Sequence, residues 1–278
     1  MRLHVGCAMW THAAWDWQPA SGDRLRAYAD RCDAVEGNTT FYATPTQRTV
    51  ESWARQTPAD FRFVMKLPKP VTHERRLTGV DEEMRAFLTA MAPLGPRIHA
   101  FWAQLPATFG PSDLGALAAF LRRMPRDHRC AVEVRHPAFF ENPRAAQELE
   151  TVLGRVGAEW IPFDTTVLFD GAAVSAAEYE AQSKKPRLPR RTRALTEFPI
   201  VRYHGRDANA RTIEGWQPWV TQVVTWLQEG RSPTVFIHTP DNADSLPLAR
   251  RFHNEVEAHV PDLEPLPEPT RTEPMTLF

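Results

Sequence analysis

Short runs of hydrophobic and β-branched residues recur along the chain, and each run ends in polar or proline-rich residues. This pattern is typical of short buried strands. Between the runs lie stretches with helical periodicity, such as DEEMRAFLTAMAPLG and PSDLGALAAFLRRM. An earlier one, SGDRLRAYADRC, begins with Ser21 as its candidate N-cap. The eight expected strands span residues 3–7, 33–38, 61–68, 98–106, 130–137, 159–165, 199–206 and 234–240.

The alternation of strands with helices predicts the fold class. Strands that alternate with helices form a parallel sheet, and eight of them in a chain of 278 residues suit a closed sheet. We therefore expect an α/β fold, a single (β/α)₈ TIM-like barrel with its helices outside. The barrel is expected to span residues 1–260, and a flexible tail rich in proline and glutamate is expected over residues 261–278.

The alternation inside each strand predicts a polar pocket. Alternate residues of a barrel strand face the interior and the helix layer. In CAVEVRHP, Val132 and Val134 suit the helix side, which turns Glu133 and Arg135 inward. Barrel enzymes have their active sites at the carboxyl ends of the strands, where nearly every strand here carries such a residue. The other side chains predicted to face inward are Glu36, Asn38, Lys66, Gln104, Asp164, Arg202, His204 and His238.

Several segments resemble the domain-of-unknown-function 72 (DUF72) family of YecE-like barrel proteins. They are GCAMW (6–10), VEGNTTFYATP (35–45), TPADFRFVMKLP (57–68), LPATF (105–109), AVEVRHPAFF (131–140) and VRYHGRD (201–207), together with Trp53 and His73. The resemblance covers residues 3–250 and implies a TIM-like barrel, but it implies no function. In one departure from the family pattern, His238 stands where the resemblance leads us to expect asparagine, and Asn242 follows a little later.

The predicted pocket has the groups that acid–base catalysis needs, because carboxylates lie beside imidazole and lysine. We expect Glu36 and Glu133 to be the carboxylates closest to the chemistry and His204 to carry the proton, with Lys66 and Asp164 as further catalytic candidates. Such a site suits isomerisation, elimination or hydrolysis of a small anionic molecule, sugar-like or phosphorylated. The expected substrate contacts are Arg135, Arg202, Asn38, Tyr42, His73, Gln104, Trp10, His238 and Asn242.

Two other interpretations of the pocket remain open. Buried charges must be paired because desolvation is costly, so Glu133 with Arg202, or Glu36 with Lys66, can form a structural ion-pair lattice. The barrel can also be a ligand-sensing module without catalysis, since the same scaffold hosts many functions.

Composition narrows the function classes further. A net charge of −1 provides no global field for nucleic acid or an anionic membrane. The chain has three cysteines but no CxxC pair, and it shows neither a long apolar run nor a signal-peptide pattern. These features favour a cytoplasmic protein. No GxGxxG, Walker or GxSxG motif occurs, so we predict no cofactor. A divalent metal remains possible, although no HExxH or DxD run is present.

Two further segments favour an alternative role as a nucleic-acid-associated enzyme or binder. The stretch SKKPRLPRRTR (183–193) can clamp phosphate groups, although a solvated charge run is the alternative. The last five residues, PMTLF, are similar to hydrophobic peptides that dock on bacterial sliding clamps, with Met275, Leu277 and Phe278 as anchors. The basic residues of the first stretch are Lys184, Lys185, Arg187, Arg190, Arg191 and Arg193.

Overall fold

A parallel sheet of nine strands forms the centre of the computed structural model, which describes residues 1–17, 19 and 22–269. Neighbouring strands follow the order β6-β5-β4-β3-β2-β1-β9-β8-β7, and every pair is parallel. The predicted α/β fold with a parallel sheet is therefore confirmed. The strands are β1 (His4–Cys7), β2 (Ala34–Gly37), β3 (Arg62–Lys66), β4 (Ile98–Gln104), β5 (Cys130–Glu133), β6 (Glu159–Trp160), β7 (Phe163–Asp164), β8 (Ile200–His204) and β9 (Thr234–His238).

The sheet has nine strands rather than eight because the predicted sixth strand is divided. Ile161 and Pro162 separate β6 from β7, and Pro162 has no N–H to donate to a neighbouring strand. Ile161 still donates its N–H to Val132 O of β5 at 2.9 Å, whereas Pro162 O accepts from Arg202 N of β8 at 3.1 Å. The segment therefore changes its pairing partner at this dipeptide, and the two end strands of the sheet are consecutive in the chain.

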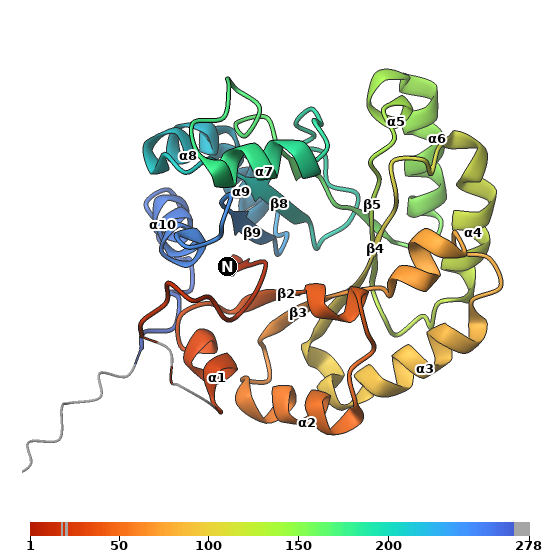
Figure 1. Cartoon of the computed structure of the whole chain (residues 1–278), viewed down its shortest axis with the longest axis horizontal. Coiled ribbons are helices and arrows are strands. Elements are labelled where there is room, and N and C mark those ends of the chain that lie inside the picture. Colours follow the sequence, from red (N-terminus) through yellow and green to blue (C-terminus); the bar gives the residue numbers. More distant parts are fainter. Residues whose placement is uncertain (18, 20–21, 270–278) are drawn as a thin grey trace, which may run out of the picture.

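Helices surround the sheet (Figure 1). Side chains cap three of them at the N-terminus, since Thr46, Asn142 and Ser175 each accept a backbone N–H. Ser21, the predicted cap of the first helix, lies outside the described residues. The helices are α1 (Arg24–Ala29), α2 (Gln47–Gln56), α3 (Asp81–Met91), α4 (Leu114–Arg123), α5 (Ala138–Glu141), α6 (Pro143–Gly154), α7 (Ala176–Lys184), α8 (Asn209–Gly215), α9 (Gln217–Gln228) and α10 (Ser245–Glu257), with short turns η1 (Asn38–Phe41), η2 (Pro70–Glu74), η3 (Ala92–Arg97) and η4 (Pro111–Asp113).

Two apolar clusters show which way the strand residues face. The larger cluster includes Phe63 and Met65 of β3, whereas Val64 between them belongs to a smaller one. Because successive strand residues point to opposite faces, the smaller cluster lines the inner face of the sheet. Its members are Ala34, Val64, Ala100, Trp102, Ala131, Ile161, Ile200 and Phe236. The predicted polar residues follow these positions by two, so they form the next inner layer: Glu36, Lys66, Gln104, Glu133, Arg202 and His238.

Asp164 is the exception, and its predicted inward orientation was wrong. Its carboxylate accepts hydrogen bonds from Trp219 Nε1 at 2.6 Å and from Arg190 Nε at 2.7 Å. Trp219 belongs to α9 in the helix layer, so Asp164 points away from the interior. Ile161 and Phe163 face inward instead. Since residues 160–163 are all apolar or proline, alternation alone could not distinguish the two faces of this strand.

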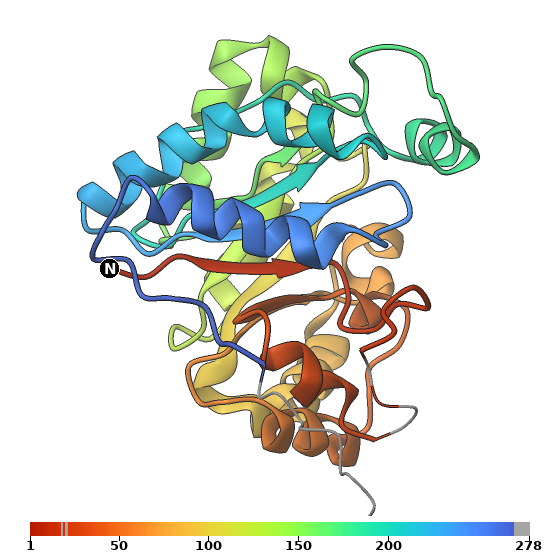
Figure 2. The same cartoon turned by 90° about the vertical axis from the view of Figure 1, so that its left-hand side faces the viewer.

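The carboxyl ends of the strands carry the connections that build the site. In Figure 2 the arrowhead of β1 points toward the side on which α7 and the segment before it lie. Lys184 at the end of α7, Lys185 after it, and residues from the loops after β1, β2, β3, β5 and β9 line a cavity at these strand ends. In the described part of the chain no helix is long and apolar enough to cross a bilayer.

The first part of the segment predicted as a C-terminal tail packs on the rest of the chain. Leu263 and Leu266 are buried within the larger apolar cluster. Glu264 donates its backbone N–H to Met1 O at 2.9 Å, and Arg250 Nη1 donates to Pro267 O at 2.8 Å. Burial of the two leucines stabilises this attachment. The clamp-like residues Met275, Leu277 and Phe278 lie outside the described residues.

Candidate functional site

A cavity of about 490 Å³ opens at the carboxyl ends of the strands, and we call it the mouth cavity. It contains most of the side chains that the sequence placed in the pocket. Phe41, Lys69 and Lys184 also line it, although they are not among the predicted catalytic or substrate-contacting residues. Its lining residues are Ala8, Met9, Asn38, Phe41, Tyr42, Lys66, Lys69, His73, Gln104, Arg135, Lys184, Lys185, Arg202, His204, His238, Pro240 and Asn242.

Arg202 of β8 joins the two buried carboxylates beneath this lining. Its Nε and Nη2 donate to Glu36 Oε1 and Oε2 at 2.6 and 3.0 Å, and its Nη1 donates to Glu133 Oε2 at 2.7 Å. The guanidinium also lies over Trp102 and Phe163, 4.3 and 4.5 Å from their ring centres. A planar fork suits such a two-carboxylate contact. Arg202 is therefore occupied by protein partners on all three nitrogens.

The two carboxylates have further partners besides Arg202. Arg135 Nε and Nη2 both lie 2.8 Å from Glu133 Oε1. Glu36 accepts from Asn38 Nδ2 at 2.8 Å and lies 2.8 Å from His238 Nε2, which must carry the hydrogen because a carboxylate only accepts. Of the two ion pairs that the sequence suggested, the one between Glu133 and Arg202 is present. Glu36 pairs with Arg202 rather than with Lys66.

These contacts decide the charge of both carboxylates. Burial alone would raise the pKa of Glu36, but Arg202 and then His238 hold it well below its usual range. Burial opposes ionisation of Glu133 in the same way, and Arg135, Arg202 and Lys66 bring its pKa below the usual value. Both groups are therefore anionic near neutral pH and balance the charges of Arg202 and Arg135.

Lys66 differs from the arginines because none of the described carboxylates forms an ion pair with it, although Glu133 and Glu36 act on it from a greater distance. Within the described residues, no carboxylate oxygen lies within 4.0 Å of its Nζ. The ammonium instead lies 4.1 Å from the ring centre of Phe41 and 4.9 Å from that of Trp102. Burial, followed by the positive charge of Arg202, lowers the pKa of Lys66 to about 7. The group thus changes its charge in the physiological range.

Lys185 is a second cation of this kind. It follows α7, lines the mouth cavity and has no ion pair within the described part of the chain. Burial and the nearby Arg202 and Arg135 lower its pKa. The other two lysines of the cavity have partners, since Lys69 Nζ lies 3.5 Å from Glu74 Oε1 and Lys184 pairs with Glu180. Two arginines and two carboxylates cancel, so Lys66 and Lys185 leave the cavity with an excess of positive charge.

Three imidazoles line the cavity as uncharged groups. Burial, followed by the proximity of the His238 ring and of Lys185, holds the pKa of His204 well below its usual range, and burial likewise lowers that of His238. Burial and then Lys66 lower the pKa of His73 to about 4. The rings of His204 and His238 stack at 5.8 Å. They can exchange hydrogen bonds with a ligand, but they supply no positive charge near neutral pH.

The family is decided by the sequence comparison. The profile of a family described as "Protein of unknown function DUF72" matches residues 4–272. The chain belongs to the DUF72 family. It is similar to the UPF0759 protein YecE of Escherichia coli K12, with 35% identity over 265 residues that cover 95% of this chain and 96% of YecE. It is also similar to the UPF0759 protein YunF of Bacillus subtilis 168, with 25% identity over 224 residues, 77% of this chain and 72% of YunF.

The solved structures support the fold of this DUF72 chain. A crystal structure of a DUF72 family protein from Enterococcus faecalis V583 superimposes with a TM-score of 0.69 at 18% identity, covering 98% of this chain and 100% of that one. A second crystal structure from the same organism gives a TM-score of 0.65 at 20% identity, covering 91% and 98%. At this identity the likeness concerns the fold alone.

Trp10 lies outside the mouth cavity of this DUF72 protein, against the prediction that it contacts substrate. It packs edge-on against Trp53 at 5.3 Å and lines a separate hollow beside α2. Trp15 and Trp17 stack on each other at 5.5 Å in the same region. The predicted substrate contact Tyr42, which is exposed, does line the cavity, together with Phe41.

The basic stretch is largely neutralised by carboxylates. Arg190 pairs with Asp164 at 2.7 Å, while Arg191 and Arg193 pair with Glu150 of α6 at 2.7 and 2.9 Å. The stretch therefore presents Lys185 to the mouth cavity but not a continuous row of free cations. Arg187 lines a larger neighbouring hollow of about 930 Å³.

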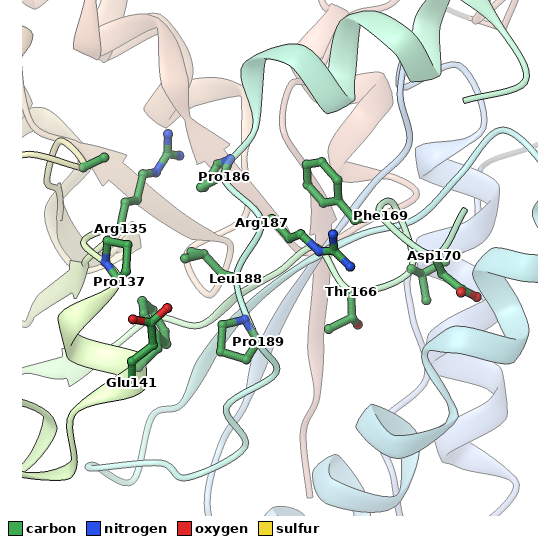
Figure 3. Close-up of a pocket in the computed structure, with 13 residues that line it drawn as sticks. Arg135, Pro137, Glu141, Thr166, Phe169, Asp170, Pro186, Arg187, Leu188 and Pro189 are labelled. Atoms are coloured by element: carbon green, nitrogen blue, oxygen red, sulfur yellow. The ribbon is translucent and has the colours of Figure 1, made fainter. Parts of the chain in front are cut away.

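Figure 3 shows this second hollow, which shares Arg135 with the mouth cavity. Arg135, Pro137 and Glu141 lie on one side, and Thr166, Phe169 and Asp170 lie on the other. The segment 186–189 runs between them, and its Arg187 points toward Thr166 and Asp170. The two hollows therefore meet at a single cationic side chain.

A metal centre is not evident among the residues that can be described. Residues 1–17, 19 and 22–269 contain no group of three or more His, Cys, Asp or Glu side chains arranged to hold a metal ion. Glu36 and Glu133, the best ligands by charge, already accept hydrogen bonds from Arg202 and its neighbours.

Proposed function

We propose that this protein is an enzyme that binds a small polar anion in the mouth cavity and acts on it by acid–base chemistry. One observation carries the proposal. The two carboxylates of the site balance two arginines, while Lys66 and Lys185 face the cavity without a carboxylate partner in the described chain. An uncompensated positive charge in a partly buried cavity attracts an anion such as a carboxylate or phosphate.

The proposal assigns the proton transfer to Lys66 rather than to His204. An efficient acid–base group has a pKa near the working pH, and the pKa of Lys66 is lowered to about 7. His204 stays uncharged, and its Nδ1 lies 3.0 Å from Gly205 O. This contact leaves Nε2 as an acceptor for a ligand hydroxyl. Glu36 and Glu133 act as positioning residues because they fix Arg202 beneath the cavity.

We further infer that the sheet closes into an eight-stranded barrel. Residues 159–164 then act as one strand that pairs with β5 through its first half and with β8 through its second half. The backbone hydrogen bonds from Ile161 to Val132 and from Arg202 to Pro162 support this arrangement. Closure would place the mouth cavity where barrel enzymes bind their substrates.

A thermal-shift screen tests the binding part of the proposal. A ligand that binds only the folded state raises the melting temperature, so phosphate, sugar phosphates and short carboxylic acids can be compared without an assay. We expect at least one of these anions to stabilise the wild type. The shift should disappear in Lys66→Met and persist in Arg144→Gln, which removes an exposed charge on α6. The proposal would be contradicted if no anion raised the melting temperature of the wild type. It would also be contradicted if the shift in Lys66→Met were as large as in the wild type.

Deuterium exchange tests the catalytic part. An acid–base enzyme that removes a proton from carbon and later returns one there, as in an isomerisation, incorporates solvent deuterium into its ligand when the base exchanges its proton with water. We expect NMR to detect incorporation into a stabilising anion in D₂O with the wild type and not with Lys66→Met. Binding without incorporation or turnover would identify a ligand-sensing protein instead of an enzyme.

A further inference from the structure

We propose that Lys66 is also a nucleophile and forms an imine with the carbonyl group of an anionic substrate. This inference rests on the proposed function and names the substrate class, an aldehyde or ketone that carries a carboxylate or phosphate. It differs from general acid–base catalysis because a covalent bond joins the protein to its ligand.

The distribution of lysine supports this assignment. The chain has only four lysines, Lys66, Lys69, Lys184 and Lys185, against 29 arginines, and all four line the mouth cavity. All the remaining 29 basic residues, histidine aside, are arginine. Guanidinium cannot lose its proton in a protein, whereas an amine can. Lysine is therefore restricted to the one place where an uncharged nitrogen nucleophile would be useful.

The surroundings of Lys66 favour its neutral form. Its side chain is largely removed from water, which disfavours the ammonium, and Arg202 and Arg135 add positive charge nearby. Desolvation and neighbouring cations are the two means by which proteins activate lysine as a nucleophile. Because the pKa of Lys66 is lowered to about 7, a large fraction of this side chain is uncharged at neutral pH, against fewer than about one in a thousand for an ordinary lysine.

The proposed step balances without an added oxidant or reductant. The lone pair of neutral Nζ forms a bond to the carbonyl carbon, and the π electrons of the carbonyl move to its oxygen. The two hydrogens of the amine then leave with that oxygen as water, and a C=N bond remains. Lys185 and Arg135 line the same cavity and are the cations available for the anionic group of the substrate.

Borohydride trapping tests this inference on the intact chain. Borohydride reduces an imine to a stable secondary amine, so the labelled lysine can be located by peptide mass spectrometry. The probes are glyoxylate, pyruvate, glycolaldehyde phosphate and dihydroxyacetone phosphate. We expect at least one probe to label Lys66 at least about tenfold more than Lys69 or Lys184, which serve as internal controls. In Lys66→Arg, which keeps the positive charge, the labelling at this position is lost.

The matched alcohols separate this inference from the proposed function. Lactate and glycerol 3-phosphate carry the same anionic groups but no carbonyl, so they can bind without forming an imine. A thermal shift with these alcohols, together with no label at Lys66 from any carbonyl probe, would overturn the imine and leave anion binding intact. Labelling spread equally over the four lysines would also overturn it. Absence of any shift with all six compounds would count against the proposed function itself.

Discussion

Arg202 and Glu36 form a two-point ion pair between β8 and β2, with nitrogen–oxygen distances of 2.6 and 3.0 Å. The same guanidinium reaches Glu133 on β5 at 2.7 Å. Three strands that are far apart in the sequence are thus joined by one buried side chain. A buried charge that loses its partner is costly, so this residue supports the whole inner layer of the site.

Replacement of Arg202 should therefore destabilise the fold strongly. In Arg202→Met two buried carboxylates lose their main partner, and we expect the free energy of unfolding to fall by about 3–5 kcal/mol. Urea denaturation at neutral pH measures the change. Arg144→Met is the control, because the ion pair of Arg144 with Glu148 lies on an exposed helix face. Its loss should lower the free energy of unfolding by less than about 0.5 kcal/mol. Similar losses in both variants would contradict the buried network.

Anion binding should depend on pH through Lys66. This lysine is cationic below its pKa of about 7 and neutral above it, so affinity for an anion should fall as the pH rises through about 7. Thermal shifts with one stabilising anion, measured across this range, test the sign. Lys66→Arg should keep its shift to higher pH, since guanidinium stays charged. An affinity that rises with pH in the wild type would be incompatible with this role.

Glu133→Gln should bind an anion more tightly while it folds less stably. The substitution removes a negative charge beneath the cavity and releases Arg135 from its carboxylate partner. We expect the dissociation constant of the anion to fall about fivefold and the melting temperature of the unliganded protein to decrease. Calorimetric titration measures the first effect and a melting curve the second. Weaker binding would mean that Glu133 itself contacts the ligand.

Asp164→Asn should affect stability but not the site. Asp164 accepts hydrogen bonds from Trp219 and Arg190 in the helix layer, and loss of its charge there should cost about 1–3 kcal/mol. The thermal shift caused by an anion should keep its wild-type size, because this carboxylate does not line the mouth cavity. A lost shift would restore Asp164 as a candidate for the site.

The sequence predicted the inner polar layer wherever a strand alternates between polar and apolar residues. Glu133 lies between Val132 and Val134, and Lys66 follows Val64 by two, so their orientation could be derived from the spacing. Asp164 could not be placed in this way because the residues before it are apolar on both faces. Alternation carries information only where the two faces differ.

Contacts between segments far apart in the chain could not be predicted from the hydrophobic and polar pattern. Glu36 and Arg202 are 166 residues apart, and no local signal tells which of several cations would reach this carboxylate. The same holds for the basic stretch, where Arg190 and Arg191 turn to Asp164 and Glu150 while Lys185 turns to the mouth cavity. One signal was available: four lysines among 33 basic residues mark two short segments, and both reach the same cavity.

A crystal structure with the anion that gives the largest thermal shift would locate the anion relative to Lys66 and Lys185. We expect the anion in the mouth cavity, with an oxygen within about 3 Å of Lys66 Nζ or Lys185 Nζ. An anion bound only beside Arg187 in the neighbouring hollow, or a mouth cavity that stays empty at saturating concentration, would contradict this expectation.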